Sequence, residues 1–485
     1  LLLVFITTTT ALTVLAFGAA RARDVPKVAT GFIASVLCSE TFVSGLDPDR
    51  VLTETQAAMP GAGLLSWAMD VRVDRAAKDV TVTLLGLGRS HAVYRDGLGC
   101  HMEHGEGKDW PAVRPSQAQP ALLPDIAPPR VVAPATPAIA VALDRAFAEP
   151  EAPPFRRTHA VLVMKDGKVI AEHYAEGVSI DTPLLGFSAT KSTTATLIGI
   201  LVRQGRLSLH TPAPVAAWQG DGDPRHAITV DQLLRHTAGL ALGSSLQASL
   251  LSALEPVNRM KFIERDRAAF AESMPLETAP GTVSNYHDGN TLILSHLIRD
   301  AAGGSAADVL RFAHRELFDP LGMRNVTIEF DAAGTPEGSS QMLASARDWA
   351  RLGQLYLDDG VIAEPGIDRR LDPLTECLEI ETVVLADADH PIADERRVEL
   401  VGEQFGDRQG HAFHLGLVDD VGRLGEEIAL DAAIGDDREG DHFAAYQFLD
   451  RFLLSRFGIG IRRLGKFDRR IDRSERNHGD PETCQ

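Results

Sequence analysis

A serine and a lysine three residues apart are the clearest candidates for catalysis in this sequence. Ser188 and Lys191 lie within residues 186–191, which read GFSATK. On a helix, residues i and i+3 share one face with their Cβ atoms ~5–6 Å apart, so a lysine amine can reach the serine hydroxyl. A serine hydroxyl needs such a neighbouring base to act as a nucleophile. The spacing therefore predicts acyl transfer at Ser188 with Lys191 as the base.

Lys191 can serve as a base only when it loses its proton. The apolar residues that follow it predict a buried helix ending near Gly205. Burial and the positive end of a helix both disfavour a charged amine, so we expect a lowered pKa for Lys191. The backbone N–H groups of the same helix end would face a developing oxyanion. A motif this short also arises by chance, with the serine as a helix cap and the lysine in solvent.

Three stretches around this motif resemble one family of serine hydrolases. They are residues 187–192 (FSATKS), 205–209 (GRLSL) and 228–240 (ITVDQLLRHTAGL). They resemble the serine β-lactamase-related family, which includes penicillin-binding carboxypeptidases, esterases and 6-aminohexanoate-oligomer hydrolases. The resemblance extends over about residues 25 to 360. It is closest to the aminohexanoate-hydrolase-like branch, which also carries an N-terminal anchor and a small domain containing cysteines.

This resemblance implies an α+β fold in which an antiparallel sheet lies beside a helical subdomain, and it implies that Ser188 is the nucleophile. It also implies a tyrosine opposite the serine, for which Tyr286 is the match. Beside a cationic lysine, such a tyrosine can pass a proton to the leaving group, although it can also serve only to hold a loop. The family pattern is often Tyr-x-Asn, and Asp288 stands where the asparagine would be.

The family's third motif, Lys-Thr-Gly or His-x-Gly, lies on a strand that lines the site. No lysine occurs between Lys261 and Lys466, which excludes the first version in that stretch. His414 and Gly416 fit the second version by letter, and a chance match is the alternative. After Val361 the family resemblance ends, and acidic residues become frequent. One hypothesis is that this tail is a shifted reading frame or a foreign sequence, which reading the coding DNA in its other frames beyond codon 360 would test.

Composition shifts divide the chain into five segments. A proline-rich stretch, with eight prolines spread over residues 107–137, separates a small α+β region from the hydrolase-like region. The predicted segments are an anchor or signal (1–22), a small α+β domain (23–106), a proline-rich linker (107–137), the serine hydrolase domain (138–360) and an atypical tail (361–485).

The periodicity of apolar residues predicts the elements of these segments. Strands are expected over 68–73, 80–85 and 91–94, and a hairpin over 160–174 with Asp166-Gly167 at its turn. Helices are expected over 25–38, 138–149, 187–205, 230–236, 262–273, 291–301, 306–317 and 346–357.

The first twenty residues are uncharged, and about twenty residues suffice to cross a bilayer. We expect an uncleaved membrane anchor, with a cleaved signal at residues 20–22 or a buried core helix as alternatives. This predicts a bacterial-type inner membrane with the hydrolase domain outside the cytoplasm, or export to the periplasm. Cys38 and Cys100 are candidates for a disulfide in such a compartment.

The formal net charge of −19 argues against nucleic acid as a partner. The cysteine and histidines at 100–104 fit no standard zinc spacing, so neither a metal nor an organic cofactor is expected. A small molecule or short peptide is the expected substrate. Two rivals remain: an α/β-hydrolase, which would leave Lys191 unexplained, and a binding protein on the same fold that has lost activity.

Overall fold

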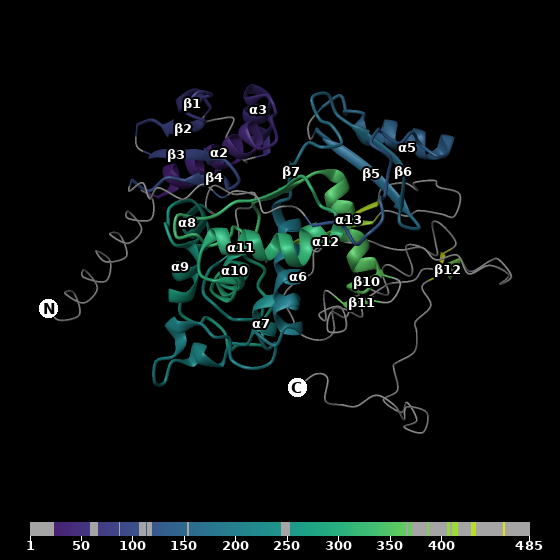
Figure 1. Ribbon diagram of the computed structural model, residues 1–485. Coiled ribbons are helices and arrows are strands. Elements are labelled where there is room, and N and C mark those ends of the chain that lie inside the picture. Colours follow the sequence, from purple (N-terminus) through teal and green to yellow (C-terminus); the bar gives the residue numbers. More distant parts are fainter. Residues whose placement is uncertain are drawn as a thin grey trace, which may run out of the picture. The chain divides into compact units, whose positions relative to one another are not determined.

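The computed structural model describes residues 24–58, 66–86, 88–105, 119–152, 155–243 and 253–364, with Val113, residues 367–370 and short strands of the tail (Figure 1). The chain divides into two compact units, Leu1–Pro134 with Ala146–Leu378, and Ala135–Arg145 with Glu379–Gln485. The domain boundaries inferred from the sequence stay predictions. Residues 1–22 lie outside the described part of the chain. Among the described residues, no helix is long and apolar enough to span a membrane.

The small N-terminal region is a four-stranded antiparallel sheet covered by a helix. Val80 and Val82 on the central strand β2 are fully buried, and their neighbours alternate with them in exposure. Ile33 and Leu37 of helix α2 pack in the same core. The elements here are α2 (Val25–Phe42), α3 (Pro48–Ala58), η1 (Ser66–Ala68), β1 (Met69–Asp74), β2 (Asp79–Leu84), β3 (Gly88–Arg95) and β4 (Gly99–Met102), with the strands in sequence order in the sheet.

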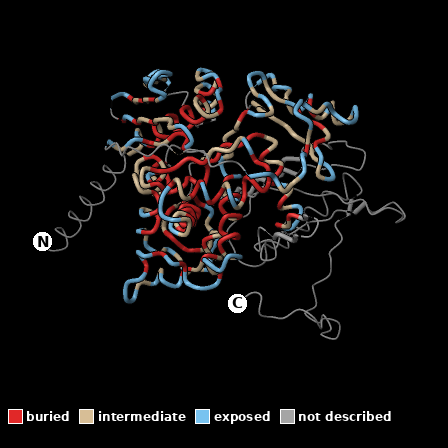
Figure 2. Tube along the Cα trace, in the orientation of Figure 1, coloured by how far each residue is buried: buried red, intermediate tan, exposed pale blue. Residues whose placement is uncertain are grey.

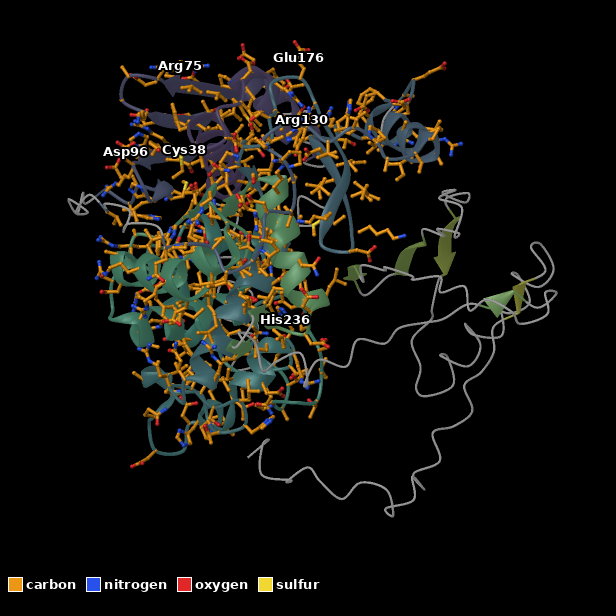
Figure 3. The ribbon with its side chains drawn as sticks, turned by 45° about the vertical axis from the view of Figure 1, so that its right-hand side comes forward. Cys38, Arg75, Asp96, Arg130, Glu176 and His236 are labelled. Carbon is orange, nitrogen blue, oxygen red and sulfur yellow. A yellow bond between two sulfur atoms is a disulfide. The ribbon has the colours of Figure 1, made fainter. Side chains whose placement is uncertain are left out.

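A disulfide joins the helix and the sheet of this region. Cys38 of α2, labelled in Figure 3, is bonded to Cys100 of β4, with their Cα atoms 6.0 Å apart. The crosslink closes a loop of 62 residues in sequence. A bridge of this kind stabilises a fold by about 2–4 kcal/mol, mainly by restricting the unfolded chain.

A buried carboxyl group connects this region to the rest of its unit. Glu329 follows strand β8 (Val326–Ile328) and is fully buried. The Ser39 hydroxyl lies 2.9 Å and 2.8 Å from its two oxygens, and the Cys100 N–H donates to Oε1 at 2.8 Å. These donors adjoin the two halves of the disulfide, so the crosslink holds both of them at Glu329. Burial raises the pKa of Glu329 to about 8, against the opposing effect of these hydrogen bonds.

The strands of the hydrolase region form small antiparallel sheets. In the β5–β6 hairpin, Asp166 and Gly167 both have positive φ (50° and 70°), as a two-residue turn of this kind requires. A second sheet has the order β7–β9–β8. The strands are β5 (Ala160–Lys165), β6 (Lys168–Tyr174), β7 (Leu184–Leu185) and β9 (Met342–Ala344), with β10 (Val361–Glu364) and β11 (Ile367–Arg370) paired separately.

Helices form the main core of this region, and α6 (Thr190–Arg203) is central to it. Leu197, Ile198, Ile200 and Leu201 of α6 are all buried. Figure 2 shows many buried segments, in red, among the helices of this region. The other helices are α7 (Val230–Leu234), α8 (Pro256–Phe262), α9 (Arg267–Ser273), α10 (Asp288–Ala302), α11 (Ala306–Ala313), α12 (Asp319–Leu321) and α13 (Ala346–Leu357). Most of helix α5 (Pro137–Phe147) belongs to the second compact unit. Short turns are η2 (Phe187–Ala189), η3 (Ala216–Trp218), η4 (Pro224–Ala227) and η6 (His314–Phe318).

Two helices differ from those expected from the sequence. The helix expected over 262–273 is wrong as a single element, because α8 ends at Phe262 and Asp266 then caps α9 by accepting the N–H of Ala269. The helix expected over 306–317 changes at His314 to a π-helical turn. The tail strands are β12 (Ala386–Asp387), β13 (Phe405–Asp407), β14 (Gly410–Leu415), β15 (Ile428–Ala432) and β16 (Ile459–Gly460).

The raised pKa of Glu329 predicts a pH-dependent contribution to stability. A glutamate titrates near 4.5 when unfolded and about 8 in the folded chain, so folding is favoured less as pH rises from 4.5 through 8. Glu329→Gln cannot ionise. Between pH 5 and 8.5, we expect the free energy of unfolding of this variant, measured in urea, to fall less than that of the wild type.

The exposed Glu176, labelled in Figure 3, supplies the control. Glu176→Gln should keep the wild-type dependence. An equal loss of stability in Glu329→Gln and the wild type would contradict the protonation of Glu329 in the folded chain.

Candidate active site

Ser188 lies where the chain turns sharply from β7 into α6. The Gly186 N–H donates to the Met342 carbonyl at 2.9 Å, and a Cβ added to Gly186 would lie 2.2 Å from the Trp349 ring. Only glycine therefore leaves room for the Trp349 ring beside this turn. Phe187 has φ of 41°, which is unfavourable for a bulky side chain and is the kind of strain that concentrates at functional sites. Ser188 follows, and it is exposed.

Lys191 reaches Ser188 from the first turn of α6. Its Nζ lies 3.3 Å from Ser188 Oγ, 2.6 Å from Asp288 Oδ1 and 2.9 Å from the carbonyl oxygen of Ser339. The Lys191 side chain is only 13% exposed. An ammonium group has three N–H donors, and these three acceptors use all of them. The amine is thus fixed beside the serine hydroxyl.

Asp288 is the first residue of α10, and it binds two lysines. Its Oδ1 contacts Lys191, and its Oδ2 lies 2.8 Å from Nζ of Lys261, near the end of α8. Lys261 also donates to the Ser340 hydroxyl at 3.0 Å. The carboxylate side chain is 7% exposed. Asp288 therefore joins three helices through ion pairs at the base of the candidate site.

Two rings border the lysine on the exposed side. Tyr286 is 48% exposed, and its ring centroid lies 5.0 Å from Lys191 Nζ, within the range of a cation–π contact. The imidazole of His236, labelled in Figure 3, lies 4.7 Å from the Tyr286 ring. His236 has φ of 58°, a conformation that histidine adopts more readily than most residues. His236 thus packs against the Tyr286 ring.

The charge of Lys191 is opposite to the sequence-based expectation. Burial lowers its pKa, but the Asp288 carboxylate and Tyr286 raise it, and the net pKa lies above that of an ordinary lysine. The expectation of a lowered pKa is therefore wrong, because a buried carboxylate outweighs desolvation. For Asp288, burial raises the pKa, but Lys261 and Lys191 lower it further, so that it lies well below the usual range. The resting site thus holds two ammonium groups and one carboxylate.

The structure brings together four of the residues singled out in the sequence: Ser188, Lys191, Tyr286 and Asp288. His414 lies on strand β14 in the other compact unit, its side chain is not described, and Gly416 lies outside the described residues. Their role as the third motif stays a prediction.

Two neighbours of the site, Lys261 and His236, were not assigned roles from the sequence. His236 lies within the 228–240 stretch, so its motif was visible although its contact with Tyr286 was not. No local pattern points to Lys261, because its partner Asp288 is on a different helix.

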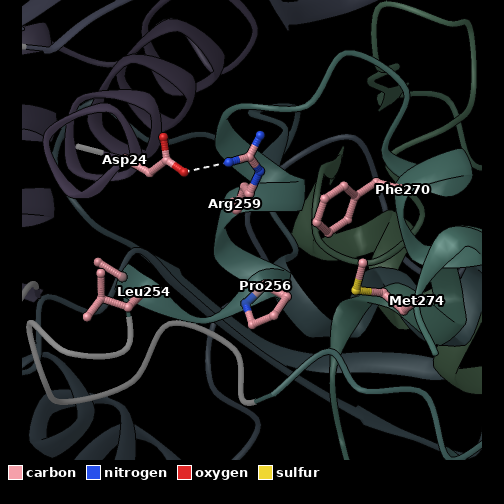
Figure 4. A pocket seen from close by; sticks show the side chains of 7 residues that line it. Asp24, Leu254, Pro256, Arg259, Phe270 and Met274 are labelled. Atoms are coloured by element: carbon pink, nitrogen blue, oxygen red, sulfur yellow. Dashed lines mark hydrogen bonds and ion pairs between the residues drawn. The ribbon is translucent and has the colours of Figure 1, made fainter. Parts of the chain in front are cut away.

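Other concave sites lie away from Ser188. A pocket lined by Asp24, Leu254, Arg259, Phe270 and Met274, among others, is shown in Figure 4, where Asp24 and Arg259 form an ion pair at 2.6 Å. This ion pair satisfies both charges at the pocket wall. Among the described residues, no group of histidine, cysteine and carboxylate side chains is arranged to hold a metal ion.

An antiparallel sheet beside a helical subdomain, with Ser-x-x-Lys at the start of a buried helix, defines the β-lactamase/transpeptidase-like class of folds. Comparison with known proteins agrees with this class. Residues 143–381 match the model of the family described as Beta-lactamase, so this part of the chain is similar to that family.

The chain is also similar to individual members of the class. It is 24% identical over 217 residues to the 6-aminohexanoate-dimer hydrolase of Paenarthrobacter ureafaciens, a match of 42% of this chain and 53% of that protein. The chain thus spans about half the length of this curated relative.

Two solved structures are similar at lower identity. A D-stereospecific amidohydrolase from Streptomyces sp. has 20% identity and a TM-score of 0.37, covering 59% of this chain and 91% of that one. The D-alanine carboxypeptidase AmpC from Burkholderia cenocepacia has 18% identity and a TM-score of 0.34, covering 64% and 96%.

The two imidazoles near Lys191 should not titrate at neutral pH. Burial lowers the pKa of both His236 and His287 to about 4; the charge of Lys191 adds to this effect, and the charge of Asp288 opposes it. His236→Phe keeps a ring against Tyr286, and a contact of this type contributes about 0.5–1.5 kcal/mol, so the variant should modify Ser188 at most about tenfold more slowly.

The rate of modification by a fluorophosphonate, followed between pH 5.5 and 7.5, should depend on pH in the same way in His236→Phe and the wild type. A transition near pH 6.5 that disappears in the variant would mean that His236 is a functional acid or base.

Proposed function

We propose that the chain is a serine hydrolase that forms an acyl-enzyme at Ser188 on an amide or ester. The observation that carries this proposal is the Lys191 amine at 3.3 Å from the exposed Ser188 hydroxyl, fixed there by Asp288 and Ser339. A fixed amine beside a serine hydroxyl is the arrangement that nucleophilic catalysis requires.

The proposed reaction has two steps. Ser188 Oγ bonds to the carbonyl carbon, and its proton passes to neutral Lys191. The bond to the leaving nitrogen or oxygen then breaks, and Tyr286, beside Lys191, relays the proton to the leaving group. Water adds to the acyl carbon in the second step, which releases the acid and restores the serine hydroxyl.

The substrate class is a 6-aminohexanoate-oligomer-like amide, an ester, a D-amino-acid peptide or a β-lactam. The amide is favoured because the matched curated relative is named a 6-aminohexanoate-dimer hydrolase. We also propose that the chain works outside the cytoplasm, anchored in the membrane or exported. The Cys38–Cys100 disulfide supports this location, because such bonds persist in oxidising compartments.

A binding protein without activity is the second candidate. The raised pKa of Lys191 favours it, because a lysine held as a cation cannot accept the serine proton. The two candidates differ in one respect that can be measured: a binding protein has no need of an activated serine.

Labelling distinguishes the two candidates. The full chain is treated with a fluorophosphonate, and the adduct is located by mass spectrometry. We expect an adduct on Ser188 that is absent in Ser188→Ala. Ser192→Ala is the matched control, because Ser192 is an exposed serine on the same helix and should leave labelling unchanged.

Hydrolysis of a 6-aminohexanoate dimer, a p-nitrophenyl ester, a D-alanyl dipeptide and a chromogenic β-lactam then identifies the substrate class. Folded protein that gives no adduct at Ser188 would favour the binding protein and overturn the hydrolase.

A further inference from the structure

The buried carboxylate of Asp288 lies between two lysines, and each of its oxygens has its own cation. Lys191 Nζ is 2.6 Å from Oδ1, and Lys261 Nζ is 2.8 Å from Oδ2. The two lysine side chains are 13% and 14% exposed, so water screens neither pair strongly. Two positive groups and one negative group in a buried site leave a net positive charge beside Ser188.

This arrangement addresses a difficulty that a carboxylate creates for a lysine base. Lys191 must release its proton to solvent before it can accept the proton of Ser188. Were Lys191 the only partner of Asp288, that release would leave a buried carboxylate unpaired, which is strongly unfavourable. The carboxylate would then hold Lys191 in its charged, inactive form. A second cation on the other oxygen keeps Asp288 paired after Lys191 becomes neutral.

We propose that Lys261 is a positioning residue that neutralises Asp288 and so allows Lys191 to lose its proton. This inference rests on the proposed function. Lys261 touches no reacting atom and acts through Asp288. It also donates to Ser340 at 3.0 Å, next to the Ser339 carbonyl that receives a hydrogen bond from Lys191, so it steadies Asp288 and Ser339, two of the three acceptors of the base.

Other titratable groups around the two lysines leave this role to Lys261. Tyr286 faces Lys191 from the loop before α10, and the buried imidazoles of His236 and His287 lie on the same side. The Glu337 carboxyl group interacts electrostatically with Lys261, and it is paired with Arg267 at 2.6 Å, both side chains being almost fully buried. Of these groups, Lys261 is the one that forms an ion pair with Asp288 beside Lys191.

The test is the pH dependence of fluorophosphonate labelling at Ser188 in the full chain. Lys261→Met should raise the midpoint of the rate-against-pH curve by about one unit or more, which makes labelling about tenfold slower below the midpoint. Asp288→Asn should lower the midpoint, because it removes the anion that favours charged Lys191. The double variant removes one charge of each sign, so its midpoint should return close to that of the wild type.

Two further variants separate charge from packing. Lys261→Arg keeps the cation and should keep the wild-type midpoint, whereas Lys165→Met, at the exposed end of β5, is the control for losing one surface lysine. An unchanged midpoint in Lys261→Met, or a double variant that keeps the full shift, would overturn the inference. If Lys261→Met does not fold, an unchanged midpoint in Asp288→Asn overturns it equally.

Labelling of the wild type keeps this test distinct from that of the proposed function. A wild-type chain without an adduct at Ser188 defeats the proposed function itself. A labelled wild type with unshifted variants defeats only the role of Lys261.

Discussion

The buried carboxylate of Asp288 is the group on which the geometry around Ser188 depends. It draws the first turn of α6 and the end of α8 toward the start of α10 through two ion pairs. Breaking a buried ion pair typically costs about 3–5 kcal/mol, because the remaining charge is left without a partner. The position of Lys191 beside Ser188 is therefore fixed by an ion pair whose separation would have a large free-energy cost. An asparagine at 288 could hold the same amine only through weaker hydrogen bonds.

A second buried acidic side chain, the carboxyl group of Glu329, also connects separate parts of the chain. Glu329 fastens the disulfide-linked N-terminal region, and the chain continues from it to Ser339, whose carbonyl accepts a hydrogen bond from Lys191. The Glu329 N–H donates to the Gln341 carbonyl at 3.0 Å, so the segment folds back on itself between these points. The N-terminal region thus contacts the same short stretch of chain that lines the base of the candidate site.

The local features of the site were predictable from the sequence, and the long-range ones were not. Ser188 and Lys191 are three residues apart, so helix periodicity alone placed them together. The hairpin at Asp166-Gly167 was similarly local. Lys261 was missed because its charge matters only through Asp288, 27 residues further on and on another helix. The break before α9 was missed because the cap at Asp266 interrupts a stretch that contains neither glycine nor proline. For the tail, His414 and Gly416 remain predictions.

Asp288 also explains why the expected burial and helix position of Lys191 were not enough to predict its charge. Burial and the helix end both favour a neutral amine, and with an uncharged neighbour that expectation would hold. A carboxylate at 2.6 Å reverses the balance, since its attraction acts in the same poorly screened site. The cation on the opposite oxygen then reduces that attraction without removing it. The charge of Lys191 in such a site depends on the balance between the Lys191–Asp288 and Lys261–Asp288 ion pairs. Substitutions at 288 and 261 therefore shift the pKa of Lys191 in opposite directions.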